Sequence, residues 1–258
     1  MGKVRPEDPA KLTDFKLLSF DVYSTLVDEH GGMFAGLQPL LTQLSTPNPY
    51  INDRDYTLSK FGTFERHLQE TQPTLLYREL LPQAYIQFAS FLQLPEPTRK
   101  DAEAFGASIG TWPAHPDTVA ALRVLKKHYK LVMLSNIDNE TIARTQSGPL
   151  AGVEFDAVYT AEMIGSYKPD LKNFEYLLKG VKREFGVEKG EVLHTAQALL
   201  ADMVPAKSMG MTASWIDREK EDEKCAELKG EGKVAFTWKF GTLGEMAKAV
   251  EAAFAGLE

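Results

Sequence analysis

The sequence between residues 17 and 25 is Leu17-Leu18-Ser19-Phe20-Asp21-Val22-Tyr23-Ser24-Thr25. Its apolar first half predicts a short buried strand at about Leu17 to Val22. Asp21 therefore falls at the carboxyl end of this strand, next to a turn of small hydroxyl residues. Open α/β folds bind their ligands at that edge of the sheet, and an aspartate there can act as a nucleophile. We therefore expect an active centre to form around Asp21.

Strands and helices alternate along the chain after residue 112. The patterns predict strands at about 131–135, 155–160, 191–196 and within 209–216. They predict helices that begin near Thr118 and Asp138 and that span 171–185 and 240–254, the last starting near Thr242. This alternation predicts an α/β fold with a mostly parallel sheet covered by helices on both faces. The charged segment 217–233 is expected to be a solvated surface.

Residues 29–111 differ in composition from the rest of the chain. They are rich in Gln, Leu and aromatic residues, and their apolar residues recur at helical spacings. Prolines are expected to divide this insert into several helices: Pro47, Pro49, Pro73, Pro82, Pro95 and Pro97. A hinge is expected at Trp112–Pro116. The predicted domains are a catalytic core of 15–28 and 112–258, a helical domain of 29–111 and an N-terminal extension of 1–14.

Composition excludes several classes of protein. The 258 residues carry a net charge of −7, from 29 Lys and Arg against 36 Asp and Glu, unlike the basic surface of a nucleic-acid binder. The single cysteine, Cys225, cannot form an internal disulfide. Neither a signal peptide nor an apolar run of membrane-spanning length is present. We expect a cytoplasmic protein that acts on a small molecule, without a nucleic-acid or membrane partner.

Four polar positions fall at or beyond the carboxyl ends of successive predicted strands. They are Asp21, Ser135-Asn136, Lys168 and Asp202. A parallel sheet brings such positions to one edge. Each one alone also suits a turn, a helix cap or a solvated surface, but the ordered set indicates an active site.

The set resembles the motifs of the haloacid dehalogenase superfamily, which also contains many phosphatases. The resembling segments are Phe20–Leu26, Leu134–Asn136, Tyr167–Asp170 and Asp202–Lys207. The resemblance implies a Rossmann-like core with an inserted all-helical cap of the first cap class, and relatives that often form homodimers. Tyr23, the segment Trp215–Arg218 and the cap type are most similar to the 2-haloacid dehalogenase branch.

Tyr23 separates the two chemistries of this superfamily. Its phosphatases carry a second Asp two residues after the nucleophile, which protonates the alkoxide as it leaves. Such general acid catalysis contributes about 10²–10⁴ in rate. A halide leaves as a stable anion, and tyrosine, with an ordinary pKa near ~10, is a poor acid at neutral pH. Tyr23 therefore favours carbon–halogen hydrolysis.

The resemblance implies a role for each residue. Asp21 would attack the carbon and form an ester, Lys168 would keep Asp21 ionised, and Asp202 would position the hydrolytic water. The implied substrate-binding residues are Tyr23, Thr25, Ser135, Asn136, Gln197 and Arg54. Dehalogenation needs no metal, whereas in the phosphatase alternative Asp21 and Asp202 would bind Mg²⁺.

Three departures from the family pattern concern the substrate. Arg54 is the nearest match to the arginine that binds a substrate carboxylate, Gln197 stands in a segment where Ser and Asn are usual, and Phe174 replaces an aromatic hydroxyl. They imply a larger or less acidic substrate, or lost dehalogenase activity. His194 is expected to be structural. A magnesium-dependent phosphomonoesterase and a non-catalytic binding module stay open as alternatives.

Overall fold

A computed structural model of the protein describes residues 10–256. Within these residues six strands form one sheet, in the order β3-β2-β1-β4-β5-β6, and every neighbouring pair is parallel. The strands are β1 (Leu17–Phe20), β2 (Lys130–Ser135), β3 (Ala157–Thr160), β4 (Val192–Ala196), β5 (Thr212–Ile216) and β6 (Trp238–Phe240). The predicted α/β fold with a mostly parallel sheet is confirmed.

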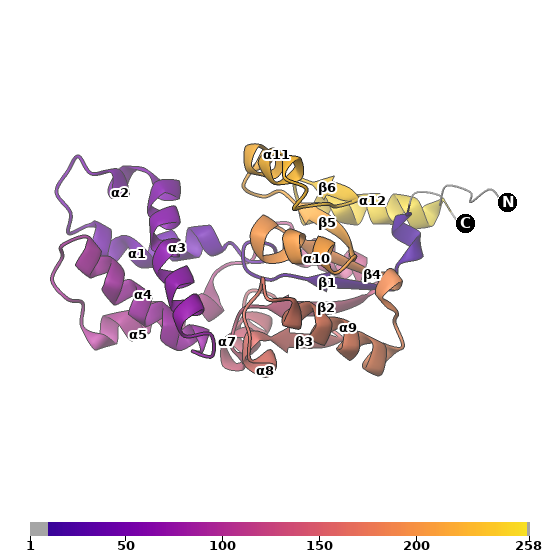
Figure 1. The fold of residues 1–258 in the computed structure, drawn as a ribbon, viewed down its shortest axis with the longest axis horizontal. Helices are drawn as coiled ribbons and strands as arrows, with labels where there is room; N and C mark the ends of the chain where they lie inside the picture. Colours follow the sequence, from indigo (N-terminus) through magenta and orange to yellow (C-terminus); the bar gives the residue numbers. More distant parts are fainter. Residues whose placement is uncertain (1–9, 257–258) are drawn as a thin grey trace.

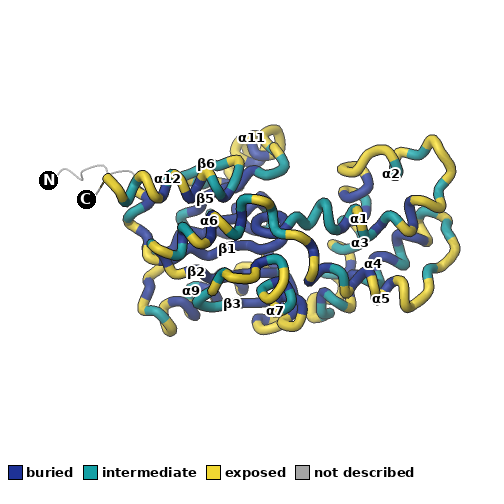
Figure 2. The backbone as a smooth tube through the Cα atoms, turned by 180° about the vertical axis from the view of Figure 1, so that it is seen from behind, coloured by how far each residue is buried: buried dark blue, intermediate teal, exposed yellow. Residues whose placement is uncertain are grey.

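Both faces of the sheet are covered. The covering helices are α6 (Thr118–Leu125), α7 (Asn139–Ser147), α8 (Ala161–Ile164), α9 (Leu171–Phe185), α10 (Val204–Ser208), α11 (Asp222–Gly230) and α12 (Leu243–Ala255). Successive strand side chains point to opposite faces. Leu18 packs in the cluster that includes α6 and α12, whereas Leu17 packs in the cluster with α9, α10 and α11. Figure 1 shows α10 in front of the sheet, and Figure 2, seen from the opposite side, shows α6 on the other face.

The remaining helices lie beyond the carboxyl ends of the strands, in purple in Figure 1. They are α1 (Glu29–Leu41), α2 (Pro49–Asn52), α3 (Arg54–Thr71), α4 (Tyr77–Phe91) and α5 (Arg99–Ser108). Phe61 anchors their core, with edge-on contacts to Phe88 and Phe105 at ring-centroid distances of 5.5 and 5.7 Å. The assignment of 29–111 as a separate domain stays a prediction.

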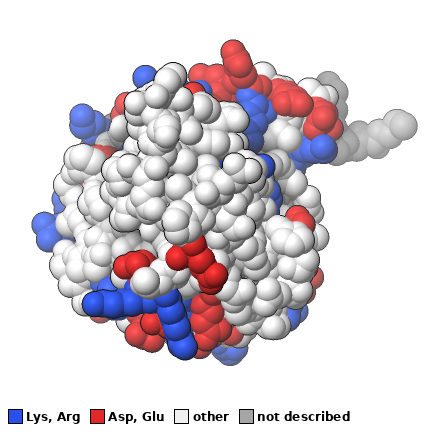
Figure 3. Space-filling view, turned by 90° about the vertical axis from the view of Figure 1, so that its left-hand side faces the viewer, with Lys and Arg blue, Asp and Glu red and all other residues white. Residues whose placement is uncertain are grey.

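The outer end of this helical part carries few charged side chains. Figure 3 looks onto that end and shows a largely uncharged surface with acidic and basic groups gathered along its lower and upper edges. Tyr56 on α3 and Phe91 on α4 are exposed apolar side chains of this part. A homodimer stays a prediction.

Pro82 does not divide two helices, contrary to expectation, but lies inside α4. A β-carbon added to Gly106 of α5 would fall 2.7 Å from the Pro82 ring, so the two helices touch at these residues. Pro82 cannot donate a backbone hydrogen bond within α4.

The structure differs from the sequence-based expectations at two further places. Segment 217–233 is not a solvated surface throughout, because Asp217 is buried and α11 buries Cys225 and Leu228. Strand β6 was not predicted, because its three residues give too short a pattern. The N-terminal extension of 1–14 stays a prediction; residues 1–9 lie outside the described residues, and Leu12 is buried. No described helix has the length and apolar character needed to cross a membrane.

Candidate active site

The strand order reverses at β1, which lies between β2 and β4. This is the switch point at which open α/β sheets form a crevice outside their carboxyl ends. Asp21 follows β1 directly, and its amide donates a hydrogen bond to the Thr195 carbonyl of β4 at 3.2 Å. Asp202 lies on a π-helical turn (Leu199–Met203) that follows β4. The topology therefore brings these two carboxylates to one crevice.

Lys168 joins the two carboxylates. Its Nζ donates to Asp21 Oδ1 and to Asp202 Oδ1, both at 2.7 Å, and to the Leu134 carbonyl at 3.1 Å. The Lys168 side chain is only 2% exposed. All three ammonium hydrogens are therefore used inside the protein, and Lys168 has none left for a substrate.

The three charges control one another. Burial lowers the pKa of Lys168, but the carboxylates of Asp202 and Asp21 outweigh it and raise that pKa. Burial raises the pKa of Asp21, Lys168 opposes the rise, and the charge of Asp202 adds to it. Burial also acts to raise the pKa of Asp202, but Lys168 and His194 outweigh it and hold that pKa below its usual range. Because the pKa of Asp202 is lowered and that of Lys168 is raised, we expect Asp202 to be ionised and Lys168 to be charged.

Thr25 orients the nucleophile candidate. Its hydroxyl donates to Asp21 Oδ2 at 2.6 Å and accepts from the backbone amide of Gln197 at 2.9 Å. Both oxygens of Asp21 therefore accept hydrogen bonds, which suits an ionised carboxylate. This arrangement fixes the carboxylate without using a substrate group.

A neighbouring threonine engages the Tyr23 hydroxyl. The hydroxyl lies 2.7 Å from Thr145 Oγ1, and either group can be the donor in this pair. Thr145 Oγ1 also lies 3.2 Å from the Thr141 carbonyl, to which it can donate. Burial raises the pKa of Tyr23 well above its usual range. The ring also packs edge-on against Trp112, with centroids 6.2 Å apart.

A cavity of about 140 Å³ opens onto these groups, and we call it the Asp21 cavity. Its polar wall contains Asp21, Tyr23, Glu29, Ser135, Lys168 and Asp202. Asn136 also lines it, but both ends of its amide hold the Lys168 backbone, with Nδ2 donating to the carbonyl at 3.0 Å and Oδ1 accepting from the amide at 2.6 Å. Ser135 is thus the better placed of the pair to meet a substrate.

His194 holds Asp202 in place. Its Nε2 lies 3.0 Å from Asp202 Oδ1, and its Nδ1 lies 2.9 Å from Ser19 Oγ on the neighbouring strand β1. Asp202 Oδ2 is buried and has no hydrogen-bond partner among the described residues. The contact between His194 and Ser19 could not be predicted from sequence patterns, because it depends on the pairing of β1 with β4.

Gln197 and Arg54 do not line the Asp21 cavity, contrary to expectation. The Gln197 side chain donates instead to Glu221, in the segment after β5, at 3.0 Å. Arg54 begins α3, is 44% exposed and pairs with Asp55 and Glu219 at 3.0 and 3.5 Å. These acids hold its guanidinium at the surface.

Glu29 was not expected at the site. It is the first residue of α1 and lines the Asp21 cavity. Ser24 Oγ donates to Glu29 Oε2 at 2.6 Å. In the sequence it resembles an ordinary acidic residue in the first turn of a helix, because Asp28 before it is a capping residue.

The fold and this constellation define a hydrolase class. The model of the haloacid dehalogenase-like hydrolase family matches residues 15–195, and the chain belongs to that family. A comparison with curated proteins found no match.

Solved structures share the fold at low sequence identity. The L-2-haloacid dehalogenase from Xanthobacter autotrophicus with chloropropionic acid covalently bound has a TM-score of 0.71 and 18% identity, covering 92% of this chain and 98% of that chain. The L-2-haloacid dehalogenase PA0810 has a TM-score of 0.68 and 21% identity, covering 92% and 99%. A HAD-hydrolase of Bacillus subtilis, YfnB, bound to magnesium, has a TM-score of 0.70 and 15% identity, covering 92% and 99%.

Proposed function

We propose that the protein hydrolyses a carbon–halogen bond through an ester on Asp21, as the 2-haloacid dehalogenase-like motifs imply. The observation that carries the proposal is Tyr23, which stands where a phosphatase needs its acid, has a hydroxyl engaged by Thr145, and has a pKa that burial raises. Lys168 supplies a positive charge between Asp21 and Asp202. This charge balances the negative charge of the attacking Asp21 carboxylate without a metal ion.

The charges of the Asp21 cavity favour an uncharged substrate over a 2-haloacid. Lys168 is the cationic side chain in the cavity wall, and both Asp21 and Asp202 already neutralise it. Arg54, the implied partner of a substrate carboxylate, pairs instead with surface acids. A carboxylate brought into this cavity would lose its hydration without gaining a counter-charge, which is costly.

The proposed reaction has two steps. One oxygen of Asp21 attacks the carbon in line with the halogen, and the carbon–halogen electron pair leaves with the halide. Water then hydrolyses the resulting ester. Asp202 Oδ2 suits this water, because it is a buried acceptor in the cavity wall without a protein partner.

Halide release tests the proposal. Chloride release is measured with EDTA present from 2-chloropropionamide and from each enantiomer of 2-chloropropionate. We expect faster release from the uncharged amide and loss of at least about 10³ in rate in Asp21→Asn, since its amide is not a nucleophile. The surface variant Asp101→Asn serves as the matched control. Chloride release that persists in Asp21→Asn, or none in the wild type, would contradict the proposal.

A phosphomonoesterase is the second candidate. Asp202 Oδ2 favours it, because an unpaired buried carboxylate oxygen is a ligand type that Mg²⁺ accepts. The other donors fit a metal poorly, since Lys168 Nζ lies 2.7 Å from both Asp21 and Asp202, where it already balances their charge. Within residues 10–256 no group of three or more His, Cys, Asp or Glu side chains has metal-binding geometry.

Phosphate release distinguishes this candidate. We expect no phosphate from p-nitrophenyl phosphate at millimolar MgCl₂ and no loss of chloride release with EDTA. Phosphate release that depends on magnesium, and that disappears in Asp21→Asn, would make the second candidate the better one.

A further inference from the structure

Glu29 is an acid in the wall of the Asp21 cavity that the proposed mechanism does not use. The helix α1 begins at this residue and projects it over the carboxyl edge of the sheet, eight positions after Asp21. The hydrogen bond from Ser24 engages Oε2, which leaves Oε1 for a proton or a ligand. Asp21 and Glu29 therefore flank the space in which a substrate would lie.

Ser24 is held in an unusual backbone conformation that serves this contact. Its φ angle is +65°, in the left-handed region that favours glycine. A non-glycine residue there costs of order 1 kcal/mol. The 2.6 Å hydrogen bond to Glu29 gives the serine hydroxyl a definite function that a glycine could not provide.

The surroundings of Glu29 favour its neutral form. Burial raises the pKa of Glu29, the Ser24 and His30 contacts oppose the rise, and the charge of Asp21 adds to it. The titratable groups that act on Glu29 or respond to it are Asp21, Tyr23, His30, Glu65, Tyr77 and Lys168. His30 Nδ1 lies 3.3 Å from Glu219, and Lys168 is paired with two aspartates, so carboxylates other than Glu29 already face both groups.

We propose that Glu29 is the catalytic acid of this site and donates its carboxyl proton to the leaving atom of the substrate. The inference rests on the proposed displacement by Asp21. The donor comes from the helical part of the chain rather than from the turn after β1 that carries Tyr23, and it serves the departing halide.

Protons are conserved over the two steps of the reaction. As Asp21 attacks, the bond between carbon and halogen breaks and its electron pair leaves with the halide. When the halide is fluoride, the most basic of the halide ions, the Glu29 proton moves to it, giving HF and a Glu29 carboxylate. Hydrolysis of the Asp21 ester by one water yields the alcohol, the Asp21 carboxylate and one proton. That proton returns to Glu29. With chloride, a weak base, the Glu29 hydroxyl donates only a hydrogen bond and keeps its proton.

This role assigns a substrate class. The substrate is a small uncharged organic halide whose leaving atom accepts a strong hydrogen bond, with fluoride as the limiting case. An acid is worth about 10²–10⁴ in rate when the leaving group needs a proton, and much less when it does not. The ratio of the fluoride-release rate to the chloride-release rate therefore measures the contribution of the acid.

The experiment compares chloride and fluoride release from 2-chloropropionamide and 2-fluoropropionamide by the full chain. In Glu29→Gln, whose amide keeps a hydrogen-bond donor but has no acidic proton, we expect fluoride release to fall about 10²-fold or more and chloride release by less than about 10-fold. The matched control is Glu175→Gln, which changes an exposed carboxyl of α9 outside the Asp21 cavity. Equal losses for both halides, or no loss for either, would overturn the inference.

The variant Ser24→Gly provides a second test that does not threaten the fold, since glycine relieves the positive φ. Ser24 donates to the Glu29 carboxylate and so lowers its pKa, and its removal should raise that pKa further. The alkaline limb of fluoride release should therefore move to higher pH, and an unmoved limb would count against Glu29. If the wild type released neither halide, the proposed function itself would fall, which is a different result from loss confined to the Glu29 variants.

Discussion

The residue that determines the electrostatics of the site is Lys168. Its ammonium lies between two buried carboxylates, and each of its three hydrogens has an acceptor. A buried ion pair that loses one partner leaves an uncompensated charge, which typically costs about 3–5 kcal/mol. Asp21 and Asp202 can therefore both stay ionised at this depth only while Lys168 is present.

Lys168→Met should move the acid limb of chloride release to higher pH. Asp21 attacks as a carboxylate, so activity is lost as the pH falls through its pKa, which already lies above the ordinary value. Removal of Lys168 takes away the group that opposes the rise. The pH dependence of kcat/KM is the measurement, with the exposed Lys172→Met as control, and an unchanged acid limb in Lys168→Met would contradict this assignment.

At the scale of elements, the end of β5 supports the turn that carries the site. Arg218 follows β5, and its side chain is 6% exposed. It donates to the Thr25 carbonyl at 2.9 Å and to both oxygens of Asp117, before α6, at 2.9 and 3.3 Å. Asp117 also accepts from the Gly244 amide of α12 at 2.9 Å. One guanidinium thereby connects the turn after β1 with α6 and α12.

Arg218→Met should lower the free energy of unfolding by about 2–4 kcal/mol at neutral pH, because Asp117 and the Thr25 carbonyl lose their donor. Burial acts to raise the pKa of Asp117, but the hydrogen bonds from Arg218 and Gly244 hold it below its usual value. Stability from a lowered carboxyl pKa is present above the unfolded-state pKa and is lost as the pH falls through the folded-state value.

The difference in the free energy of unfolding between wild type and Arg218→Met should therefore become smaller at acid pH. Urea unfolding at a series of pH values measures it, and the exposed Arg123→Met gives the baseline for losing a surface arginine. A difference that stays constant down to the lowest pH would show that the Asp117 pair is not its source.

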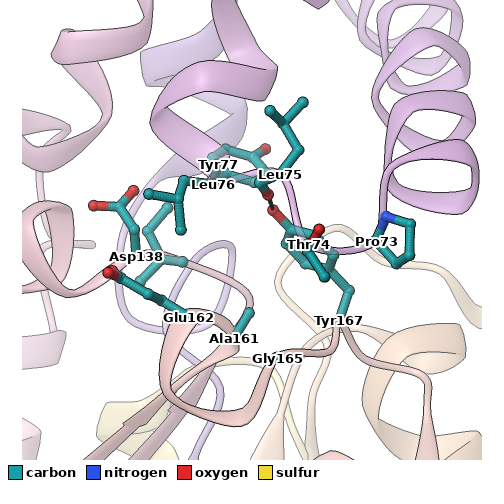
Figure 4. A pocket seen from close by; sticks show the side chains of 11 residues that line it. Pro73, Thr74, Leu75, Leu76, Tyr77, Asp138, Ala161, Glu162, Gly165 and Tyr167 are labelled. Atoms are coloured by element: carbon teal, nitrogen blue, oxygen red, sulfur yellow. Dashed lines mark hydrogen bonds between the residues drawn. The ribbon is translucent and has the colours of Figure 1, made fainter.

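At the scale of the whole molecule, the helical part closes over the carboxyl edge of the sheet through a few polar contacts. A second cavity, of about 120 Å³, lies at this junction (Figure 4). On its rim the Tyr167 hydroxyl donates to the Leu75 carbonyl, and Arg78 at the start of α4 donates to Asp138, which caps α7. Because Tyr167 precedes Lys168 in the chain, the position of the helical part is coupled to the charged centre.

Tyr167→Phe should weaken this closure without disturbing the charged centre. The variant removes one hydroxyl and leaves the Leu75 carbonyl without its donor, which costs about 0.5–1.5 kcal/mol. We expect faster proteolytic cleavage in the segment 72–76 and a higher KM with little change in kcat. Tyr176→Phe, on α9, is the matched control, and equal cleavage rates in the two variants would contradict the coupling.

Local patterns in the sequence were sufficient to predict most elements of the fold and the identity of its charged centre. The limits of α9 and the cap at Thr242 were predicted closely, because apolar periodicity and capping residues act within a few turns of chain. Asp21, Lys168 and Asp202 were predicted to meet, because parallel strands place their carboxyl ends at one edge. Their catalytic roles stay predictions.

Only the tertiary structure determined which other side chains face the cavity. Arg54 and Gln197 turn to surface acids, while Glu29 and His194 turn to the site. These orientations depend on strand register and on how α1 leaves the sheet, and residues far apart in the chain set both. Periodicity and composition describe neighbours in sequence, so they carry no information on such contacts. The physical reason is that a side chain's partner is chosen by packing, after the local elements have formed.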